Sequence, residues 1–270
     1  MISEICIVAA AGFLSVGLRS FQSQACFRIG TLGFILTSFL AGWLLGGSLV
    51  LGAVFASTWF LLPWLEILTR VRRLRMPLQR SLEKCPPPPA SRFPDFSALS
   101  DEMESLGFDY ADDVDWSHDD TRHFYRLFCN AEKRVTASIC LLEQDSHAFF
   151  YVTFKSKAMD GRTFLTWNYP FSYGMHLLPN TRLNKVDDEL RIEELFASHQ
   201  DFVDLHETVE LAPQAAESLR EEIERELRGQ LEHNIARGIL VRDKNEMIRY
   251  SVRGMFFLWC EFLREFVRFS

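Results

Sequence analysis

IGTLGFILTSFLAGWLLGGSLVLGAVFASTWFLLPWL, residues 29–65, runs for 37 residues without a charged side chain and decides the fold. A helix that crosses the hydrocarbon core needs about 20 apolar residues, so one straight helix of roughly 55 Å would be too long. Gly46 and Gly47 interrupt the run, and adjacent glycines permit a sharp reversal of the chain. No polar face divides the stretch, which disfavours a buried hairpin of a soluble protein. The sequence therefore predicts a transmembrane helical hairpin with spans near 29–45 and 48–65, in which Gly42 and Gly46 allow close helix packing.

A shorter apolar run, ICIVAAAGFLSVGL, occupies residues 5–18. Its 14 residues are few for a span. It also lacks the basic start of a signal peptide, because Glu4 stands where a positive charge is expected. A marginal third span and an interfacial helix are both open, and the anchor as a whole is predicted to cover residues 1–80.

Charge separates the chain into two parts. Residues 1–92 hold nine basic and three acidic side chains, a net charge of +6, whereas the whole chain carries −7. The remaining 178 residues therefore carry −13. An acidic body repels nucleic-acid phosphate, so no nucleic-acid partner is expected.

Four arginines follow the hairpin closely: Arg70, Arg72, Arg73 and Arg75. Basic residues within about 15–20 residues of a span mark the cytoplasmic side. We therefore expect a protein of the cytoplasmic (inner) membrane with its soluble body in the cytoplasm. These membrane-interface arginines suit anionic lipid head groups, and the lipid bilayer is the first expected partner.

Cysteine spacing and sequence motifs indicate no cofactor. The six cysteines are scattered, without a C-x-x-C pair, which is typical of free thiols in a reducing compartment. The sequence lacks G-x-S-x-G, G-x-x-x-x-G-K-[ST], G-x-G-x-x-G and H-E-x-x-H. A non-enzymatic function is favoured, with no metal or cofactor expected.

The body is predicted to begin after a proline-rich linker at residues 81–94, because four prolines at 86–89 favour an extended spacer. Residues 95–210 are expected to form an α+β domain with helices at 94–107 and 187–206. Aromatic and β-branched residues predict an antiparallel β-meander. Its predicted strands cover residues 122–129, 134–142, 148–157 and 163–169, with a fifth at 108–116 if that segment joins. Asp160 and Gly161 predict a type I′ structural turn between the last two strands.

Residues 211–270 are predicted to form a helical extension with a small hairpin. A long helix runs from Pro213 to about residue 237, a hairpin follows at 239–252, and a last helix covers 255–269. The last helix carries too many charges to span a membrane. Its apolar face is expected to pack on the body or to lie in the bilayer surface. The fold class is thus membrane-anchored α+β, with a cytoplasmic meander packed with helices and a C-terminal helix–hairpin–helix.

Three stretches support this organisation: FKSKAMDGRTFLTWN at 154–168, EELFASHQD at 193–201 and RYSVRG at 249–254. Together they resemble a module found in uncharacterised bacterial membrane-anchored proteins with a cytoplasmic domain of unknown function. The resemblance would cover most of residues 95–260. It implies a strand, a D-G turn and a helix, and it carries no activity.

Two groups of polar residues are candidates for metal-binding sites. Residues 112–120 contain five aspartates, which suit Ca²⁺ or Mg²⁺, but the central glycine and terminal glutamate of an EF-hand are missing. A solvated loop is the simpler interpretation. His199 and His206 are two helical turns apart, about 10 Å, which is too far for one shared metal ion. Each histidine is expected to cap the helix or to pack against neighbouring side chains.

The favoured function is a membrane-tethered cytoplasmic interaction or regulatory module. One alternative is a membrane-bound enzyme with an unrecognised site near the meander. Another is a structural assembly subunit that binds a protein partner or a second copy. That alternative would use an apolar seam on the long helix, formed by Leu219, Ile223, Leu227, Leu231 and Ile235.

Overall fold

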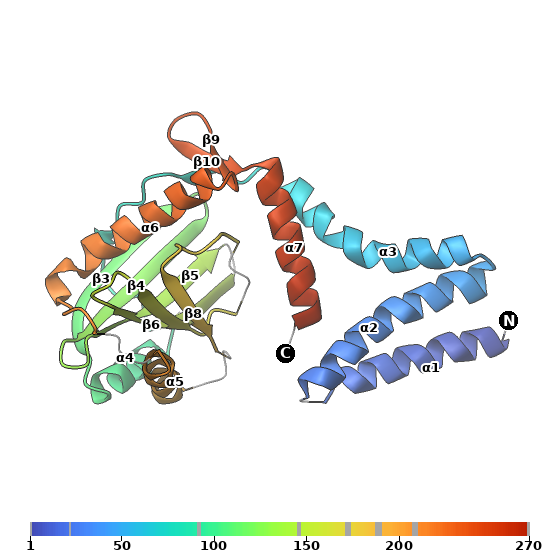
Figure 1. Ribbon diagram of the computed structural model, residues 1–270, viewed down its shortest axis with the longest axis horizontal. Helices are drawn as coiled ribbons and strands as arrows, with labels where there is room; N and C mark the ends of the chain where they lie inside the picture. Colours follow the sequence, from blue (N-terminus) through green and yellow to red (C-terminus); the bar gives the residue numbers. More distant parts are fainter. Residues whose placement is uncertain are drawn as a thin grey trace. The chain divides into compact units, whose positions relative to one another are not determined.

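The computed structural model describes residues 2–21, 23–90, 93–144, 147–170, 174–186, 191–206 and 210–268. The chain forms an α+β structure of two compact units (Figure 1). The helical unit comprises Met1–Arg75, Arg237–Arg242 and Arg249–Ser270. The sheet unit comprises Met76–Ala236 and Asp243–Ile248. The last helix therefore groups with the N-terminal helices.

Three apolar helical segments make up the N-terminal part of the helical unit. Their elements are α1 (Ile2–Arg19), α2 (Gln24–Leu40), the π-helical η1 (Ala41–Leu45), α3 (Leu49–Glu66) and the π-helical η2 (Ile67–Val71). The segments Ile2–Arg19, Ala25–Leu45 and Leu49–Val71 are each long and apolar enough to cross a membrane. The 5–18 run is therefore part of a full third candidate span, and the two predicted spans are longer than their uncharged cores.

The reversal between the second and third segments depends on glycine. Gly47 has a φ of +67°, a conformation that residues with a Cβ rarely adopt. A Cβ at Gly42 would lie 2.6 Å from the Leu51 carbonyl oxygen and 2.8 Å from the Gly52 Cα. The close helix approach therefore pairs Gly42 with Gly52, and Gly46 takes no such part.

The helical unit also contains the C-terminal helix, α7 (Val252–Arg268), and the short strand β9 (Leu240–Arg242). Ser251 caps α7, because its hydroxyl accepts a hydrogen bond from the Gly254 N–H at 2.9 Å. The Ser251 N–H donates to the Ile239 carbonyl at 2.9 Å. A Cβ at Gly254 would clash with that same carbonyl, so glycine is needed for the start of α7 to lie against residue 239.

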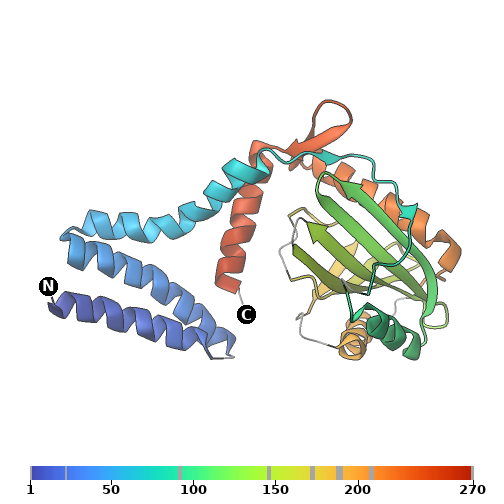
Figure 2. The same ribbon diagram turned by 180° about the vertical axis from the view of Figure 1, so that it is seen from behind.

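The sheet unit is built on a seven-stranded sheet in the order β2-β3-β4-β5-β6-β7-β8 (Figures 1 and 2). The strands are β2 (Glu83–Lys84), β3 (Asp109–His118), β4 (Thr121–Asn130), β5 (Val135–Gln144), β6 (His147–Lys157), β7 (Thr163–Trp167) and β8 (Thr181–Lys185). Each neighbouring pair is antiparallel except β7 and β8, which are parallel. The predicted four-stranded meander is present, its fifth strand joins as β3, and two short edge strands extend it.

Helices cover both faces of this sheet. They are α4 (Phe96–Ser105), α5 (Ile192–Asp204), the 3₁₀ turn η3 (Ala216–Ser218) and α6 (Leu219–Ala236). Two further short strands, β1 (Met76–Pro77) and β10 (Met247–Tyr250), pair antiparallel with Met76 opposite Ile248. The predicted helix at 187–206 is observed from Ile192, and residues 187–190 lie outside the described part of the chain.

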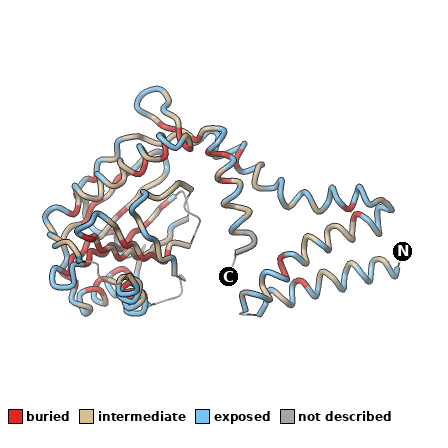
Figure 3. The backbone as a smooth tube through the Cα atoms, in the orientation of Figure 1, coloured by how far each residue is buried: buried red, intermediate tan, exposed pale blue. Residues whose placement is uncertain are grey.

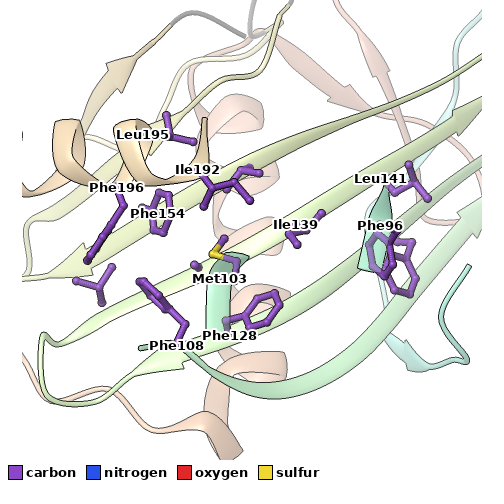
Figure 4. Packing of buried hydrophobic residues seen from close by; sticks show 14 residues of the cluster. Phe96, Met103, Phe108, Phe128, Ile139, Leu141, Phe154, Ile192, Leu195 and Phe196 are labelled. Carbon is purple, nitrogen blue, oxygen red and sulfur yellow. The ribbon is translucent and has the colours of Figure 1, made fainter. Parts of the chain in front are cut away.

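Alternation along the strands places buried clusters of the described residues on both faces of the sheet. The larger cluster joins α4 and α5 to the sheet (Figure 4). Its buried members are Phe96, Met103, Phe108, Phe124, Phe128, Val135, Ala137, Ile139, Leu141, Val152, Phe154, Ile192, Leu195 and Phe196. The smaller cluster, on the α6 side, contains Leu82, Val114, Trp116, Leu127, Cys129 and Leu219. In Figure 3 the buried backbone of the sheet unit follows the central strands.

The first residues of the predicted linker belong to the sheet. Glu83 and Lys84 form β2, opposite Asp115 and Val114 of β3. The side chain of Leu82 is only 2% exposed and packs in the smaller cluster. An extended chain that begins with a core leucine can add a strand to a free sheet edge, and the prolines that follow end the pairing.

Asp160 and Gly161 lie in the turn between β6 and β7, but the turn is not type I′. Gly161 has a φ of +85°, whereas the φ of Asp160 is not positive. The Gly161 N–H donates to the Ala158 carbonyl at 3.0 Å, and the Ala158 N–H donates to the Arg162 carbonyl at 2.8 Å. This is the three-residue hairpin loop in which one glycine takes the left-handed conformation. The Asp160 carboxylate accepts from the Arg162 N–H at 3.0 Å, which fixes the loop without positive φ at residue 160.

Candidate functional site at the end of α3

The strongest candidate site lies where α3 ends. Pro63 is inside α3 and has no N–H to donate, and the following residues, 67–71, wind as a π-helix. The Arg72 N–H donates to the Ile67 carbonyl at 2.8 Å, five residues back. Short π-helical turns are frequent at functional sites because they change the direction of side chains on one turn.

A cavity of about 520 Å³ opens here, lined by Leu68, Arg72, Arg73 and Arg75. Three of its four lining residues are arginines, and none is acidic. Arg75 also holds the backbone, because its Nη1 donates to the carbonyls of Arg72 and Leu74, both at 3.1 Å. The cavity is therefore strongly positive and has one apolar side.

Arg70, the fourth predicted interface residue, is placed differently. Its Nη1 lies 3.3 Å from Glu66 Oε1, one helical turn earlier, and it does not line the cavity. Both side chains are largely exposed, so this ion pair contributes little stability. The structure thus brings Arg72, Arg73 and Arg75 together and leaves Arg70 on the helix surface.

The side chains that line this cavity are suited to binding an anion. Guanidinium groups stay charged and present planar donors that match phosphate and carboxylate oxygens. The four lining residues include no nucleophile and no general base. The site is therefore suited to holding an anionic group that has an apolar neighbour.

The aspartate-rich segment at 112–120, expected as a solvated loop, is mostly strand. It lies in β3 and the turn after it, and three of its five carboxylates pair with cations of the same unit. Asp113 pairs with Arg126 at 2.7 Å, Asp115 with Arg122 at 2.6 Å, and Asp112 with Lys84 at 3.0 Å. These pairings explain the acidic composition by packing of the sheet. In the described part of the chain, no group of three or more His, Cys, Asp or Glu residues could hold a metal ion.

His199 lies in the core of the sheet unit. Its Nε2 is 3.1 Å from Ser156 Oγ, and its Nδ1 is 2.9 Å from Thr166 Oγ1. All three side chains are fully buried, so the serine–histidine contact has no access to a substrate. Burial lowers the pKa of His199 to about 4. The neutral ring is a structural element that links α5 to β6 and β7.

His206 serves the end of the same helix. Its Nδ1–H donates to the Phe202 carbonyl at 2.8 Å, and its ring packs 5.0 Å from the ring of Phe164. The two histidines therefore have separate partners, as their spacing predicted.

The α6 side of the meander carries further buried polar groups. Ser138 Oγ lies 2.6 Å from Thr153 Oγ1 and 3.3 Å from Cys140 Sγ. Burial raises the pKa of the Cys140 thiol to about 12, and it raises the pKa of Tyr151 well above its usual range. A thiol that stays protonated is a poor nucleophile. This network therefore gives no support to an enzymatic site near the meander.

Comparison with known proteins found no matching family model, no matching curated protein and no matching solved structure. The resemblance to bacterial membrane-anchored modules therefore stays a prediction. The residues at the end of α3 are the feature of the molecule that points to a function.

Proposed function

We propose that this chain is a membrane-tethered interaction or regulatory module, whose arginine cavity at the end of α3 binds anionic phospholipid head groups. The observation that carries the proposal is the cavity of Arg72, Arg73 and Arg75 directly after a candidate span. Each basic residue near an anionic membrane surface contributes about 1 kcal/mol of attraction. Leu68 supplies an apolar wall beside the charges, which suits a lipid better than a free anion.

The same arginines support a cytoplasmic position for the sheet unit. Positive charge near span ends favours the cytoplasmic face. With three spans, residues 70–75 and the α1–α2 turn, which lies between Arg19 and Arg28, share one side of the membrane. The N-terminus then lies on the other side, and the net −13 body follows the arginines into the cytoplasm.

The assembly alternative receives no support from the seam on α6. Leu219 and Leu231 are buried within the chain, and Leu219 and Ile223 pack in the smaller cluster of the sheet. Lys155 also pairs with Glu222 and Glu226 of α6, at 3.2 and 3.0 Å. Much of the seam is therefore used inside the sheet unit, which disfavours assembly through α6.

The orientation is tested by fusing a reporter that fluoresces only in the cytoplasm after Ser270. We expect a bright fusion, and a periplasmic reporter at the same point should be inactive. The reverse pattern would place the body outside the cytoplasm and overturn this part of the proposal.

Lipid binding is tested on the full chain in nanodiscs of phosphatidylcholine with a minor fraction of phosphatidylglycerol. Mass spectrometry of the released complex measures how many anionic lipids stay bound. We expect the Arg72→Gln/Arg73→Gln variant to lose retained phosphatidylglycerol severalfold. The Arg70→Gln variant is the matched control, because Arg70 pairs with Glu66 outside the cavity.

Equal retention in both variants and the parent chain would overturn the head-group assignment. A second arm titrates inorganic phosphate against the detergent-solubilised chain. Phosphate binding that depends on Arg72 and Arg73, without selective lipid retention, would instead identify a free anion as the ligand and contradict the lipid proposal.

A further inference from the structure

The C-terminal helix α7 has an apolar stripe that the helical unit covers only in part. Val252, Phe256 and Cys260 follow each other at four-residue steps and share one side of the helix. Val252 is 67% exposed and Phe256 52%, and Cys260 is exposed too. On the neighbouring flank, Met255 and Leu258 are buried. The apolar face of α7 is therefore wider than the surface it packs against.

Aromatic contacts fix α7 to the arginine-bearing end of α3. The rings of Trp64 and Phe256 meet edge to face at 4.9 Å, and those of Trp64 and Trp259 lie 6.2 Å apart. The Trp259 Nε1–H donates to the Phe60 carbonyl at 2.7 Å. Both partners belong to the helical unit, and Figure 2 shows α7 meeting the final turns of α3.

The depth of this contact follows from the sequence of α3. Trp64 precedes Arg70 by six residues, about 9 Å of helix. If the arginines lie at the head groups, Trp64 lies at the boundary between head groups and acyl chains, the position that tryptophan prefers in membranes. Leu61 and Leu65 of α3 are also exposed at this level, so the exposed stripe of α7 adjoins lipid-facing surface.

The arginines of α7 border the stripe, and its acidic residues lie on the far side. At 100° per residue, Arg253 and Arg264 lie about 20° and 40° beyond Cys260. Glu261 and Glu265 lie about 140° and 180° from the centre of the stripe, and Glu261 forms an ion pair with Arg264. An apolar stripe bordered by arginines, with the acidic residues away from it, is the pattern of a helix that lies in the membrane interface and does not span it.

We infer that α7 is a second membrane-attachment element, with Val252, Phe256 and Cys260 immersed in the interface of the leaflet that holds the arginine cavity. The inference rests on the proposed membrane anchor. It means that the chain enters and leaves the sheet unit through segments attached to the same membrane surface.

The test uses an environment-sensitive fluorophore on single introduced cysteines of the full chain in nanodiscs. Cys6 and Cys260, the exposed native thiols, are replaced by alanine, and peptide mass mapping checks the labelled position. Probes are placed at Val252→Cys on the stripe and at Arg264→Cys beyond its edge, where the side chain is 53% exposed. Twelve residues are three and a third turns, so these two positions point about 120° apart. A third probe at Leu61→Cys reports on α3.

We expect iodide, an aqueous quencher, to act severalfold more weakly at position 252 than at 264, and doxyl-labelled lipid to quench 252 strongly. Equal iodide access at 252 and 264, with a lipid-quenched probe at 61, would overturn the inference and leave the anchor intact. An iodide-quenched probe at 61 would instead show that α3 does not span. Protection at 252 without quenching by doxyl lipid would mean that protein covers the stripe, such as a second copy of the chain, and would also overturn the inference.

Discussion

Arg126 joins three parts of the sheet unit through one guanidinium group. Its Nε and Nη2 donate to the two carboxylate oxygens of Asp113, at 2.8 and 2.7 Å. Its Nη1 donates to Ser100 Oγ of α4 at 2.9 Å, and its Cζ lies 4.5 Å from the centre of the Phe96 ring. The aspartate run looked like a solvated loop or a cation site because sequence spacing cannot show the arginines of the next strand.

The buried pair should therefore matter far more than its exposed neighbour. Asp113→Asn leaves Arg126 with an uncompensated charge, and breaking a buried pair typically costs about 3–5 kcal/mol. Asp112→Asn is the matched control, because its partner Lys84 is 69% exposed and such pairs contribute about 0–1 kcal/mol. Urea-dependent pulse proteolysis of the full chain in detergent measures both variants. Equal losses of unfolding free energy would show that the Asp113–Arg126 pair is not a special element of the core.

His199 should make the sheet unit sensitive to acid. Burial lowers its folded-state pKa to about 4 from an ordinary 6.5. Between these values the unfolded chain binds a proton that the folded chain does not, so stability is complete above pH 6.5 and falls as pH drops toward 4. The loss is on the order of 3 kcal/mol, since one pKa unit equals about 1.4 kcal/mol.

The contribution of His199 is separated by comparing the parent chain with His199→Gln across this pH range. His123, whose pKa is also lowered to about 4, by burial and by the charge of Arg80, is present in both chains. The variant should be less stable at neutral pH but lose less stability on acidification. Parallel pH profiles would contradict a neutral buried His199.

Among the elements, the sequence predicted those strands and helices whose formation depends on residues within the segment itself. The strands of the meander and the helices α4, α5, α6 and α7 follow from periodicity and end signals within each segment. The edge strands β2 and β8 have two and five residues, and their pairing depends on a distant partner at a sheet edge. Composition within such short segments does not specify a partner, so the sequence could not reveal them.

The turn between β6 and β7 also shows what a local motif predicts and what it leaves open. The D-G pair predicted a hairpin, but the loop has three residues and only Gly161 needs positive φ. The hydrogen bond from the Arg162 N–H to the Asp160 carboxylate favours the longer loop. This choice depends on residues that flank the pair, which a two-residue motif does not include.

Gly161→Val should destabilise the sheet unit by about 1–3 kcal/mol, the cost of a β-branched residue in a left-handed conformation. No atom lies within 4 Å of an added Cβ, so the penalty is backbone strain and not a clash. Gly161→Asn is the control, because asparagine tolerates this conformation and should cost less. Pulse proteolysis of the full chain measures both. A valine variant as stable as the asparagine variant would show that residue 161 can leave the left-handed region freely.

At the scale of the whole molecule, charge and hydropathy predicted a basic apolar anchor and an acidic body. The contacts within the structure define two compact units. Their boundaries differ from those read in the sequence. The helical unit ends at Arg75 and resumes near the C-terminus, because the aromatic contacts of Phe256 and Trp259 with Trp64 join α7 to α3. These contacts span about 190 residues of chain, a separation over which one sequence carries no signal. The sequence predicts Arg70, Arg72, Arg73 and Arg75 together at the membrane interface, but it predicts no cavity. The arrangement of Arg72, Arg73 and Arg75 around the cavity follows the π-helical turn at the end of α3.

These boundaries predict which fragment of the chain folds alone. A fragment of residues 76–250 retains all seven strands and both core clusters, and it omits α7. It should unfold cooperatively without detergent, since about 150 residues can bury close to 70% of the surface of the unfolded chain.

A fragment of residues 93–250, which starts after the prolines, loses β2 and Leu82. Leu82 is a buried leucine, and removing such a side chain typically costs about 2–5 kcal/mol. Urea denaturation followed by circular dichroism should therefore give a clearly lower midpoint for the shorter fragment. Leu82→Ala in the longer fragment removes the packing of this side chain but keeps the pairing of β2. We expect this variant to show much of the difference in urea midpoint between the two fragments. Equal midpoints for the two fragments would place the true boundary at the prolines, whereas a longer fragment that aggregates would mean that the sheet unit needs the helical unit to fold.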